Sequence, residues 1–334
     1  MRIILRLTNA SIYDNLTDIQ DDLDRGYFMN SIPPIKKRKP LFRENSSIWG
    51  YIFILPNFIS FLVFMVVPII TSLYLSLTDW DLLTDPKWVG ISNYVKLITR
   101  DRLFMSSLIN TLMYSLYTIP FGIFVSLCLA LALNGRLVYG RTFFRSIFFL
   151  PHVCTMAAVA LVWKWFYNAE FGILNYLLGM VGIQGQKWLT NRQLALPSIA
   201  VMAVWKSAGY NMVIILAGLQ GIPSFLYEAA ELDGAMGFKR FWYITFPLLT
   251  PTLFFILIVS TIASFQVFDA IMVMTQGGPA NTTIVYNYLL YQNAFMNFRM
   301  GYASAMAYIL FFMIFVVTLL QIRLMGQRVA YDAG

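Results

Sequence analysis

Long hydrophobic stretches dominate the chain and recur every few dozen positions. Crossing the hydrocarbon core of a bilayer takes about 20 apolar residues in a helix, and at that depth a helix satisfies its own backbone groups. Six stretches are long enough, and each predicts a transmembrane helix: residues 50–77, 108–133, 144–168, 195–219, 249–274 and 302–325. The chain is therefore expected to be an all-α membrane protein with about six transmembrane helices. Pro56, Pro68 and Pro120 lie inside the first two stretches and predict kinks there.

The composition supports lipid as the main solvent of this chain. Of its 334 residues, 59% are hydrophobic and 12% are charged, whereas soluble domains carry about 25% charged residues. The two cysteines, Cys128 and Cys154, lie in apolar runs and are expected to be small packed side chains. His152 is the single histidine, so a zinc site or a Ser-His-Asp triad is not expected, and no metal site is predicted.

Lysine and arginine set the predicted orientation, because cytoplasmic loops carry an excess of both. With six spans, the segments on the side of the N-terminus carry 15 of these residues and the opposite side carries seven. The cluster at residues 36–39 is the strongest single marker. Both termini are therefore expected in the cytoplasm.

Three regions are predicted: a cytoplasmic tail at 1–47, a transmembrane domain at 48–328 and a short tail at 329–334. Residues 11–25 are polar and acidic, which is typical of a disordered or weakly helical tail and unlike a signal peptide. Met29 precedes the basic cluster, so it is a candidate for the native start of translation.

The segment 220–247, between the fourth and fifth stretches, is the most informative part of the chain. Strong helix formers predict a short helix over residues 224–233, which Ser224 is expected to cap and Gly234 to end or kink. Small and acidic side chains share one face at helical spacing: Leu226, Ala229, Ala230 and Asp233. From composition alone, an ordinary interfacial helix remains an alternative.

Spacing within this segment resembles the EAA loop of ATP-binding-cassette (ABC) importer permeases. The matching pattern is Glu228-Ala229-Ala230, three residues, Gly234, nine residues, and then Ile244 and Pro247. Phe246 stands where the family usually has leucine, which is a conservative departure. Asp233-Gly234-Ala235 is similar to the form found in carbohydrate importers.

Two further blocks carry the resemblance, which covers roughly residues 48–328. Phe268-Asp269 with Thr275 and Gly277-Gly278-Pro279 resembles the end of the fifth span in the first permease of such pairs, and the two glycines are expected in an external turn. Asn110-Thr111 is similar to the start of the transport core. The resemblance implies the type I importer permease fold.

The resemblance implies a transport complex of several subunits in a bacterial or archaeal cytoplasmic membrane. This multi-pass chain would form half of a sugar or oligosaccharide pathway and a homologous second permease the other half. Two ATPase subunits would hydrolyse ATP with Mg²⁺, and an external binding protein would deliver the cargo. No phosphate-binding loop motif occurs here, so this chain is expected to have no catalytic residue and to bind no cofactor. ATPase coupling would fall to Glu228, Ala229, Ala230, Asp233 and Gly234.

Polar groups within the spans are candidates for a substrate pathway. Lys164 lies beside two tryptophans and is expected to snorkel to the interface. Lys206 could line the pathway, pair with Asp269 or snorkel. Serines in spans often only bond neighbouring helices. The resemblance maps the sugar site of maltose-type permeases near Ser260, Ala263, Ser264 and Val267, and the full candidate set is Trp205, Lys206, Tyr210, Asn211, Ser260, Ser264, Val267 and Asp269.

Other functions remain open at this point. A permease for glycerol-3-phosphate or an anionic oligosaccharide is the first alternative, and Lys206 in the pathway would favour an anion. A secondary transporter or membrane-embedded enzyme is the second. No clear internal repeat supports the transporter, and no second acidic motif supports the enzyme.

Overall fold

The computed structural model describes residues 46–135 and 139–325. Most of the predicted N-terminal tail, the C-terminal tail and Met29 lie outside these residues, so the predicted region boundaries stay predictions. The chain divides into two units, Met1–Val66 and Val67–Gly334, which are described separately.

The described part of the first unit is one apolar helical segment. It consists of α3 (Ser46–Phe61) and the π-helical turn η1 (Leu62–Val66). Pro56 lies inside α3 without ending it. The side chains from Gly50 to Met65 are exposed and almost all apolar, as expected of a helix whose solvent is lipid.

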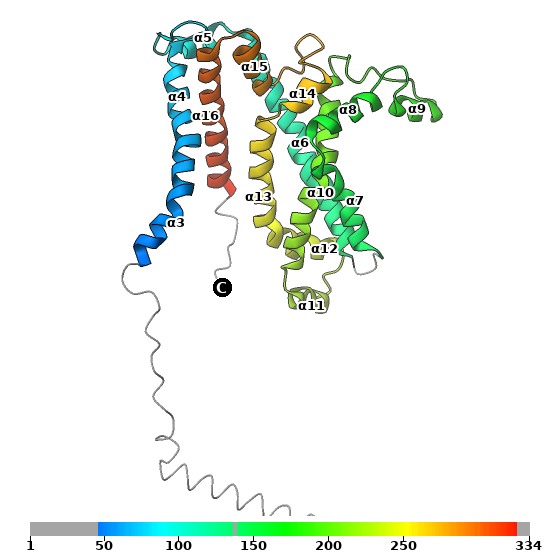
Figure 1. Ribbon diagram of the computed structural model, residues 1–334. Helices are drawn as coiled ribbons and strands as arrows, with labels where there is room; N and C mark the ends of the chain where they lie inside the picture. The colour runs from blue at the N-terminus through cyan, green and yellow to red at the C-terminus, as the bar shows by residue number, and fades with distance from the viewer. Residues whose placement is uncertain (1–45, 136–138, 326–334) are drawn as a thin grey trace, which may run out of the picture. The chain divides into compact units, whose positions relative to one another are not determined.

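Helices make up almost all of the second unit (Figure 1). In chain order its elements are α4 (Val67–Ser76), β1 (Thr78–Asp79), β2 (Lys87–Trp88), α5 (Ser92–Arg100), α6 (Arg102–Asn134), α7 (Arg141–Val153), α8 (Met156–Phe166), α9 (Ile173–Met180), α10 (Ala195–Gln220), α11 (Ser224–Leu232), α12 (Phe238–Arg240), η2 (Phe241–Thr245), α13 (Phe246–Phe265), α14 (Asp269–Met274), α15 (Tyr286–Tyr291), η3 (Gln292–Met296) and α16 (Met300–Met325). The two short strands form one antiparallel pair that sequence reasoning did not predict.

Five helical segments among the described residues are long and apolar enough to cross a membrane, and a sixth span is possible if one bent pair counts as a single crossing. The five are Gly50–Ser76, Arg102–Asn134, Ala195–Gln220, Phe238–Phe265 and Met300–Met325. Both the all-α fold and the expectation of about six spans are therefore confirmed.

Two of the predicted spans are broken rather than continuous. The stretch 144–168 divides into α7 and α8, which meet at an angle of 99° because Cys154 and Thr155 between them are extended. The stretch 249–274 divides into α13 and α14, and Phe268 at the break lies outside the helical region of φ and ψ. By contrast, α6 runs through Pro120 as one helix.

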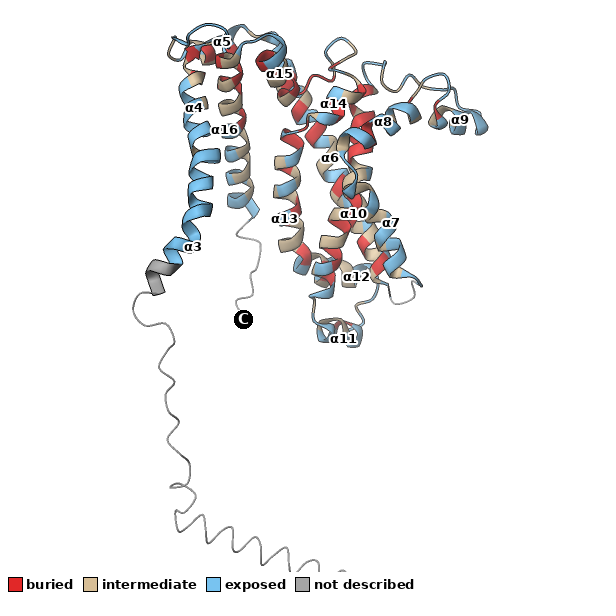
Figure 2. Ribbon diagram, viewed as in Figure 1, coloured by how far each residue is buried: buried red, intermediate tan, exposed pale blue. Residues whose placement is uncertain are grey.

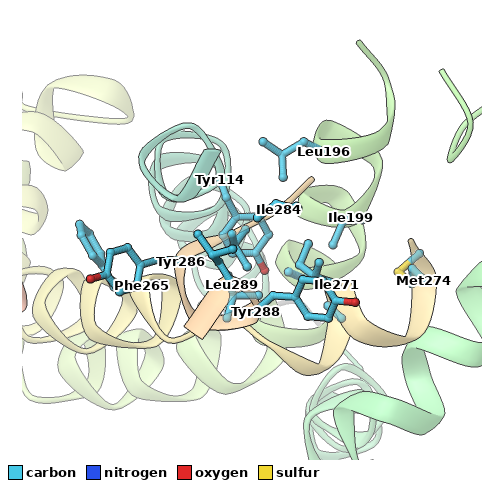
Figure 3. Close-up of a cluster of buried hydrophobic side chains, with 14 of the residues drawn as sticks. Tyr114, Leu196, Ile199, Phe265, Ile271, Met274, Ile284, Tyr286, Tyr288 and Leu289 are labelled. Atoms are coloured by element: carbon cyan, nitrogen blue, oxygen red, sulfur yellow. The ribbon is translucent and has the colours of Figure 1, made fainter. Parts of the chain in front are cut away.

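The core of the second unit lies around α10, which packs on α6, α7 and α13. Buried residues gather along α10 and around α14, whereas α4 is mostly exposed (Figure 2). One apolar cluster joins the halves of α6, α10 and α13 that lie nearest α11, with Leu133, Leu216 and Leu249 among its members. A second cluster lies at the other end, called the far end below, and includes Tyr114, Ile199 and Tyr286 (Figure 3).

Polar contacts tie the elements of the far end together. The Asn93 amide donates to the carbonyls of Ser76 (3.0 Å) and Thr78 (2.8 Å). The Tyr302 hydroxyl donates to Asp101 (2.7 Å), whose other carboxylate oxygen caps the start of α6. These bonds join α4, α5, α6 and α16 through groups that would otherwise be costly to bury.

Close backbone contact joins α7 to α10 at Gly209. A Cβ atom at this position would lie 1.8 Å from the Phe148 carbonyl oxygen. Only glycine can therefore occupy this position without separating the two helices.

Gly209→Ala is expected to destabilise the protein by about 1–3 kcal/mol, because the added methyl must push α7 away from α10. Thermal unfolding of the purified protein in detergent, followed by intrinsic fluorescence, measures the change. Gly179→Ala is the matched control, since that helical glycine has nothing within 4 Å of an added Cβ. Equal melting temperatures for the two variants would contradict the packing argument.

Candidate functional site: a short connecting helix and a cavity between broken spans

The helix α11 ends in a complete hydrogen-bonded cap. Gly234 follows the helix with φ of +74°. Its amide donates to Glu231 O (3.1 Å), and the amide of Ala235 donates to Ala230 O (2.8 Å). This pair of bonds is the Schellman motif, in which glycine adopts the left-handed conformation at low cost. The expected end of the helix at Gly234 is thus confirmed.

The start of α11 differs from the prediction. Pro223 occupies the capping position, and no side chain caps the helix there. The expectation that Ser224 caps the helix was wrong, because Ser224 is already the first helical residue. A prolyl residue lacks an amide hydrogen but its fixed φ suits a helix entry.

Exposure separates the candidate coupling residues into two groups. Glu228, Ala229, Asp233 and Gly234 are exposed, whereas Ala230 is 6% exposed and packs within the loop. The exposed face is therefore small and acidic.

Side-chain contacts hold α11 against the segment that leads into α13. The Arg240 guanidinium lies 5.6 Å from the centre of the Tyr227 ring. The Tyr227 hydroxyl lies 3.3 Å from Thr245 Oγ1. These contacts join α11 to η2, so the loop is a folded unit rather than a loose connection.

A cavity of about 270 Å³ lies where α6, α8, α10, α13 and α14 meet, next to both helix breaks. Its wall combines apolar and polar side chains: Tyr114, Thr118, Ile119, Met156, Ala203, Ser207, Asn211, Ser260, Ala263, Ser264, Gln266, Val267, Phe268, Asp269 and Ala270. Asp269 is the charged residue among them. Mixed walls with a few polar groups are typical of sites for small molecules.

Five of the eight candidate pathway residues line this cavity, namely Asn211, Ser260, Ser264, Val267 and Asp269. Three others, Trp205, Lys206 and Tyr210, lie on α10 but not on the cavity wall. The structure therefore brings most of the predicted set together. Whether the set binds cargo stays a prediction.

Hydrogen bonding distinguishes the polar groups of the wall. Ser264 Oγ accepts from Ser115 Oγ (2.8 Å) and donates to the Thr261 carbonyl (2.9 Å), so it mainly joins α13 to α6. Within the described part of the chain, no hydrogen bond involves the side chains of Asn211, Ser260 and Asp269. These three groups are therefore available to a molecule in the cavity.

Both lysines within the spans bond to backbone carbonyls. Lys206 Nζ donates to His152 O (3.1 Å), near the end of α7, and the His152 ring stacks on Tyr210 with centroids 4.4 Å apart. Lys164 Nζ donates to Val273 O (3.1 Å), near the end of α14. The pair of Lys206 with Asp269, one of the three alternatives for Lys206, does not form in this structure. Lys164, which was expected to snorkel, bonds to a neighbouring helix.

The family of the chain follows from comparison with known proteins. Residues 100–331 match the protein family described as binding-protein-dependent transport system inner membrane component. The chain belongs to this family. It is thus a multi-pass inner-membrane permease component of a transport system, and the resemblance seen in the sequence is confirmed.

Individual relatives are similar over most of their length. The probable ABC transporter permease protein YesP of Bacillus subtilis is 38% identical over 91% of this chain and 98% of its own. The sn-glycerol-3-phosphate transport system permease protein UgpA of Agrobacterium fabrum is 35% identical over 86% of this chain and 97% of its own. A solved bacterial ABC transporter involved in import of the acidic polysaccharide alginate contains a chain with a TM-score of 0.74, 26% identity and coverage of 87% of this chain and 100% of its own.

Asn110 and Thr111, which the sequence analysis named without giving them a structural role, form a polar clasp on a neighbouring loop. Asn110 Nδ2 donates to the carbonyls of Asn281 (3.1 Å) and Ile284 (2.9 Å). Thr111 Oγ1 accepts from the Tyr286 amide (2.9 Å). These adjacent residues of α6 hold the loop 276–285, which contains Gly277 with φ of +84°. The signal in the sequence was a polar pair at the start of an apolar run.

Asn110→Leu is expected to loosen the loop 276–285, because a buried carbonyl left without its donor costs about 1–3 kcal/mol. Hydrogen–deuterium exchange of the amides of residues 281–286 should become faster. Ser106→Ala is the control, since the Ser106 hydroxyl bonds only within its own helix. Unchanged exchange in Asn110→Leu would show that the clasp does not hold the loop.

Proposed function

We propose that this permease forms half of the translocation pathway of an ATP-driven importer for a sugar or oligosaccharide. A homologous second permease supplies the other half, two ATPase subunits drive transport, and an extracytoplasmic binding protein delivers the cargo. Membership of a binding-protein-dependent family supports this assembly. The observation that carries the proposal is a cavity with several polar side chains on its wall, whose lining helices α10 and α13 lead to an exposed, capped short helix.

The chemistry of ATP belongs to the partner ATPases in this proposal. ATP and Mg²⁺ bind there, and the permease contributes no catalytic residue and binds no cofactor. Both termini and α11 lie in the cytoplasm, which the excess of lysine and arginine in the segments on that side supports. The far end then faces the outside.

The connection of α11 to the cavity suggests how the two communicate. The helix α11 follows α10 along the chain and leads into α13 through α12 and η2. Asn211 lies nine residues from the end of α10, or about 14 Å along the helix at about 1.5 Å per residue. Movement of α11 by the ATPases therefore displaces both helices whose polar side chains line the cavity. The buried cluster around Leu216 and Leu249 makes α10 and α13 move together.

Hydroxyl and amide groups on the wall support a hydroxylated cargo. Asn211 and Ser260 can donate to or accept from sugar hydroxyls, and the Asp269 carboxylate can accept from them. Tyr114 and Phe268 offer ring surface. The alginate importer, whose chain has the same fold, acts on a polysaccharide. We assign binding to these groups, and a supporting role between helices to Ser264.

An anionic cargo such as glycerol-3-phosphate is the second candidate. Lys206 keeps two further donors beyond its bond to His152 and lies on the helix next to the cavity-lining Ser207. A rearrangement that turns Lys206 toward the pathway would favour an anion. UgpA relatives are named for sn-glycerol-3-phosphate.

Gly234→Trp is expected to leave membrane insertion intact but to uncouple ATP hydrolysis from transport. Gly234 is exposed in a left-handed conformation, so a large side chain both strains the cap and projects from the proposed docking face. Cargo uptake and ATPase rate are measured together in liposomes that contain the whole complex. Normal, coupled transport by this variant would refute the docking role.

Gly234→Asn is the matched control for this experiment. Asparagine tolerates the left-handed conformation better than other side chains and is much smaller than tryptophan. Most of the coupling should therefore remain. Equal loss in both variants would indicate that the conformation of the loop, rather than the docking face, was damaged.

Asn211→Leu is expected to reduce cargo uptake at least several-fold, because it replaces a free polar group of the wall by an apolar one of similar size. Ser126→Ala is the control, because the buried Ser126 hydroxyl does not line the cavity and donates to Gly122 O within its own helix. A panel of neutral sugars, acidic oligosaccharides and glycerol-3-phosphate tests the cargo class. Uptake unaffected in Asn211→Leu for every cargo would remove this side chain from the pathway.

A further inference from the structure

The short helix α9 exposes four of its apolar residues, whereas its polar residue lies on the half-buried side with Leu174 and Leu178. Ile173, Tyr176, Leu177 and Met180 are exposed, with Tyr176 at 66% and Met180 at 65%. The half-buried side includes Asn175. A helix that faces water has the opposite arrangement.

Asn175 explains why this arrangement is stable. Its amide nitrogen donates to Ala169 O (2.9 Å) and Gln186 O (2.9 Å). Its amide oxygen accepts from the Gln186 amide (2.9 Å) and from Trp188 Nε1 (2.8 Å). Two donors and two acceptor positions are all that an asparagine amide offers. The inward face of α9 is therefore fully satisfied and fixes the hairpin 169–188.

The exposed surface extends beyond the helix and is free of charge. No charged residue occurs from Phe171 to Gln186, and Glu170 and Lys187 stand at the two ends of this segment. Phe171, Val181 and Ile183 are exposed as well, at 63%, 70% and 51%. Such a contiguous apolar patch marks a surface that another apolar phase covers.

We infer that α9 lies in the boundary between lipid headgroups and acyl chains at the far end of the permease. The exposed face of α8, with Leu161, Val162 and Trp165, belongs to the bent span, and the surface of α9 continues it along the chain. Figure 1 shows α8 and α9 leading sideways from the far end of α6 and α10, with α9 extending beyond the bundle. Tyr176 and Trp165 supply the aromatic residues that this depth prefers.

The loop after α9 favours the lipid boundary over a protein partner or the bilayer centre. Residues 181–185 are irregular and exposed, and Gly182 has φ of +76°. Such backbone needs water or headgroups, which the hydrocarbon core does not provide. An eight-residue helix is about 12 Å long, and this is small against the ~800 Å² per partner of a standard protein interface.

Anchoring α9 in this boundary also fixes α8. Met156 at the start of α8 lines the cavity, and Lys164 bonds to Val273 O near the end of α14. The lipid contact of α9 thus holds one wall of the cavity in place.

Spin labelling tests the location in the full transporter complex, reconstituted in phosphatidylethanolamine–phosphatidylglycerol nanodiscs. Leu177→Cys is labelled in a Cys128→Ala, Cys154→Ala background, and Asp85→Cys in the exposed β1–β2 loop is the aqueous control. The label at position 177 should collide several-fold more with oxygen, relative to a water-soluble nickel chelate, than the label at position 85. An equal ratio would place α9 in water, and protection from both reagents would place it under a protein. Either result overturns the inference.

A second measurement addresses the anchoring of α8. Leu177→Asp should speed hydrogen–deuterium exchange of residues 156–166 in the same nanodiscs, because a carboxylate is expelled from the boundary. Gln184→Asp carries the same charge in the irregular loop and should leave α8 unchanged. No difference between the two variants would contradict the anchoring.

Discussion

Unpaired backbone groups are costly in a membrane, and the two broken spans are the places where this permease must satisfy them without a continuous helix. The carbonyls freed at the breaks find side-chain donors. Lys206 bonds to His152 O at the break between α7 and α8, and the Asn287 amide donates to Gln266 O (3.2 Å) at the break between α13 and α14. Away from the breaks, Lys164 bonds to Val273 O near the other end of α14. A positive charge near the C-terminal end of a helix also complements the helix dipole. Lys206, a candidate for the pathway, and Lys164, which was expected to snorkel, thereby acquire a structural role.

The breaks in turn create the cavity. After the turn of 99° between α7 and α8, α8 packs against α14. Met156 and Asp269, the first residues of these two helices, both line the space. Between the cavity and α11, the helices α10 and α13 are continuous. They pack closely at small residues such as Gly218, where an added Cβ would lie 2.6 Å from Thr252 Oγ1. In the proposed mechanism, the continuous helices next to α11 and the broken helices at the cavity form the route for movement between the two.

The sequence predicted those features that depend on local or one-dimensional patterns. Apolar length identified the spans, and Gly234 identified the end of α11, because glycine at that position has a conformational cause. It did not predict the bend at residues 154–155, since Pro151 lies inside α7 and the stretch 144–168 is predominantly apolar on both sides of the bend. The partners of Lys164, Lys206 and Asn110 depend on which helices pack together, and no local pattern contains that information. Ser224 failed as a cap because the preceding proline already provides a suitable helix entry.

Counting hydrogen bonds separates polar residues that look alike in the sequence. Ser260 and Ser264 lie one turn apart on α13, and both were candidates for the pathway. Ser264 has its donor and an acceptor position occupied by Thr261 and Ser115, so a cargo molecule would have to compete with the contact between α13 and α6. Ser260 lies on the same wall, and its side chain has no hydrogen-bond partner among the described residues.

The same reasoning applies to Asn211 on α10 and Asn175 on α9. Asn175 has used every donor and acceptor it has, and serves structure, whereas Asn211 is 7% exposed, faces the cavity and retains its full capacity to bind. Within a membrane, where an unpaired polar group is expensive, that unused capacity is the stronger argument for a function.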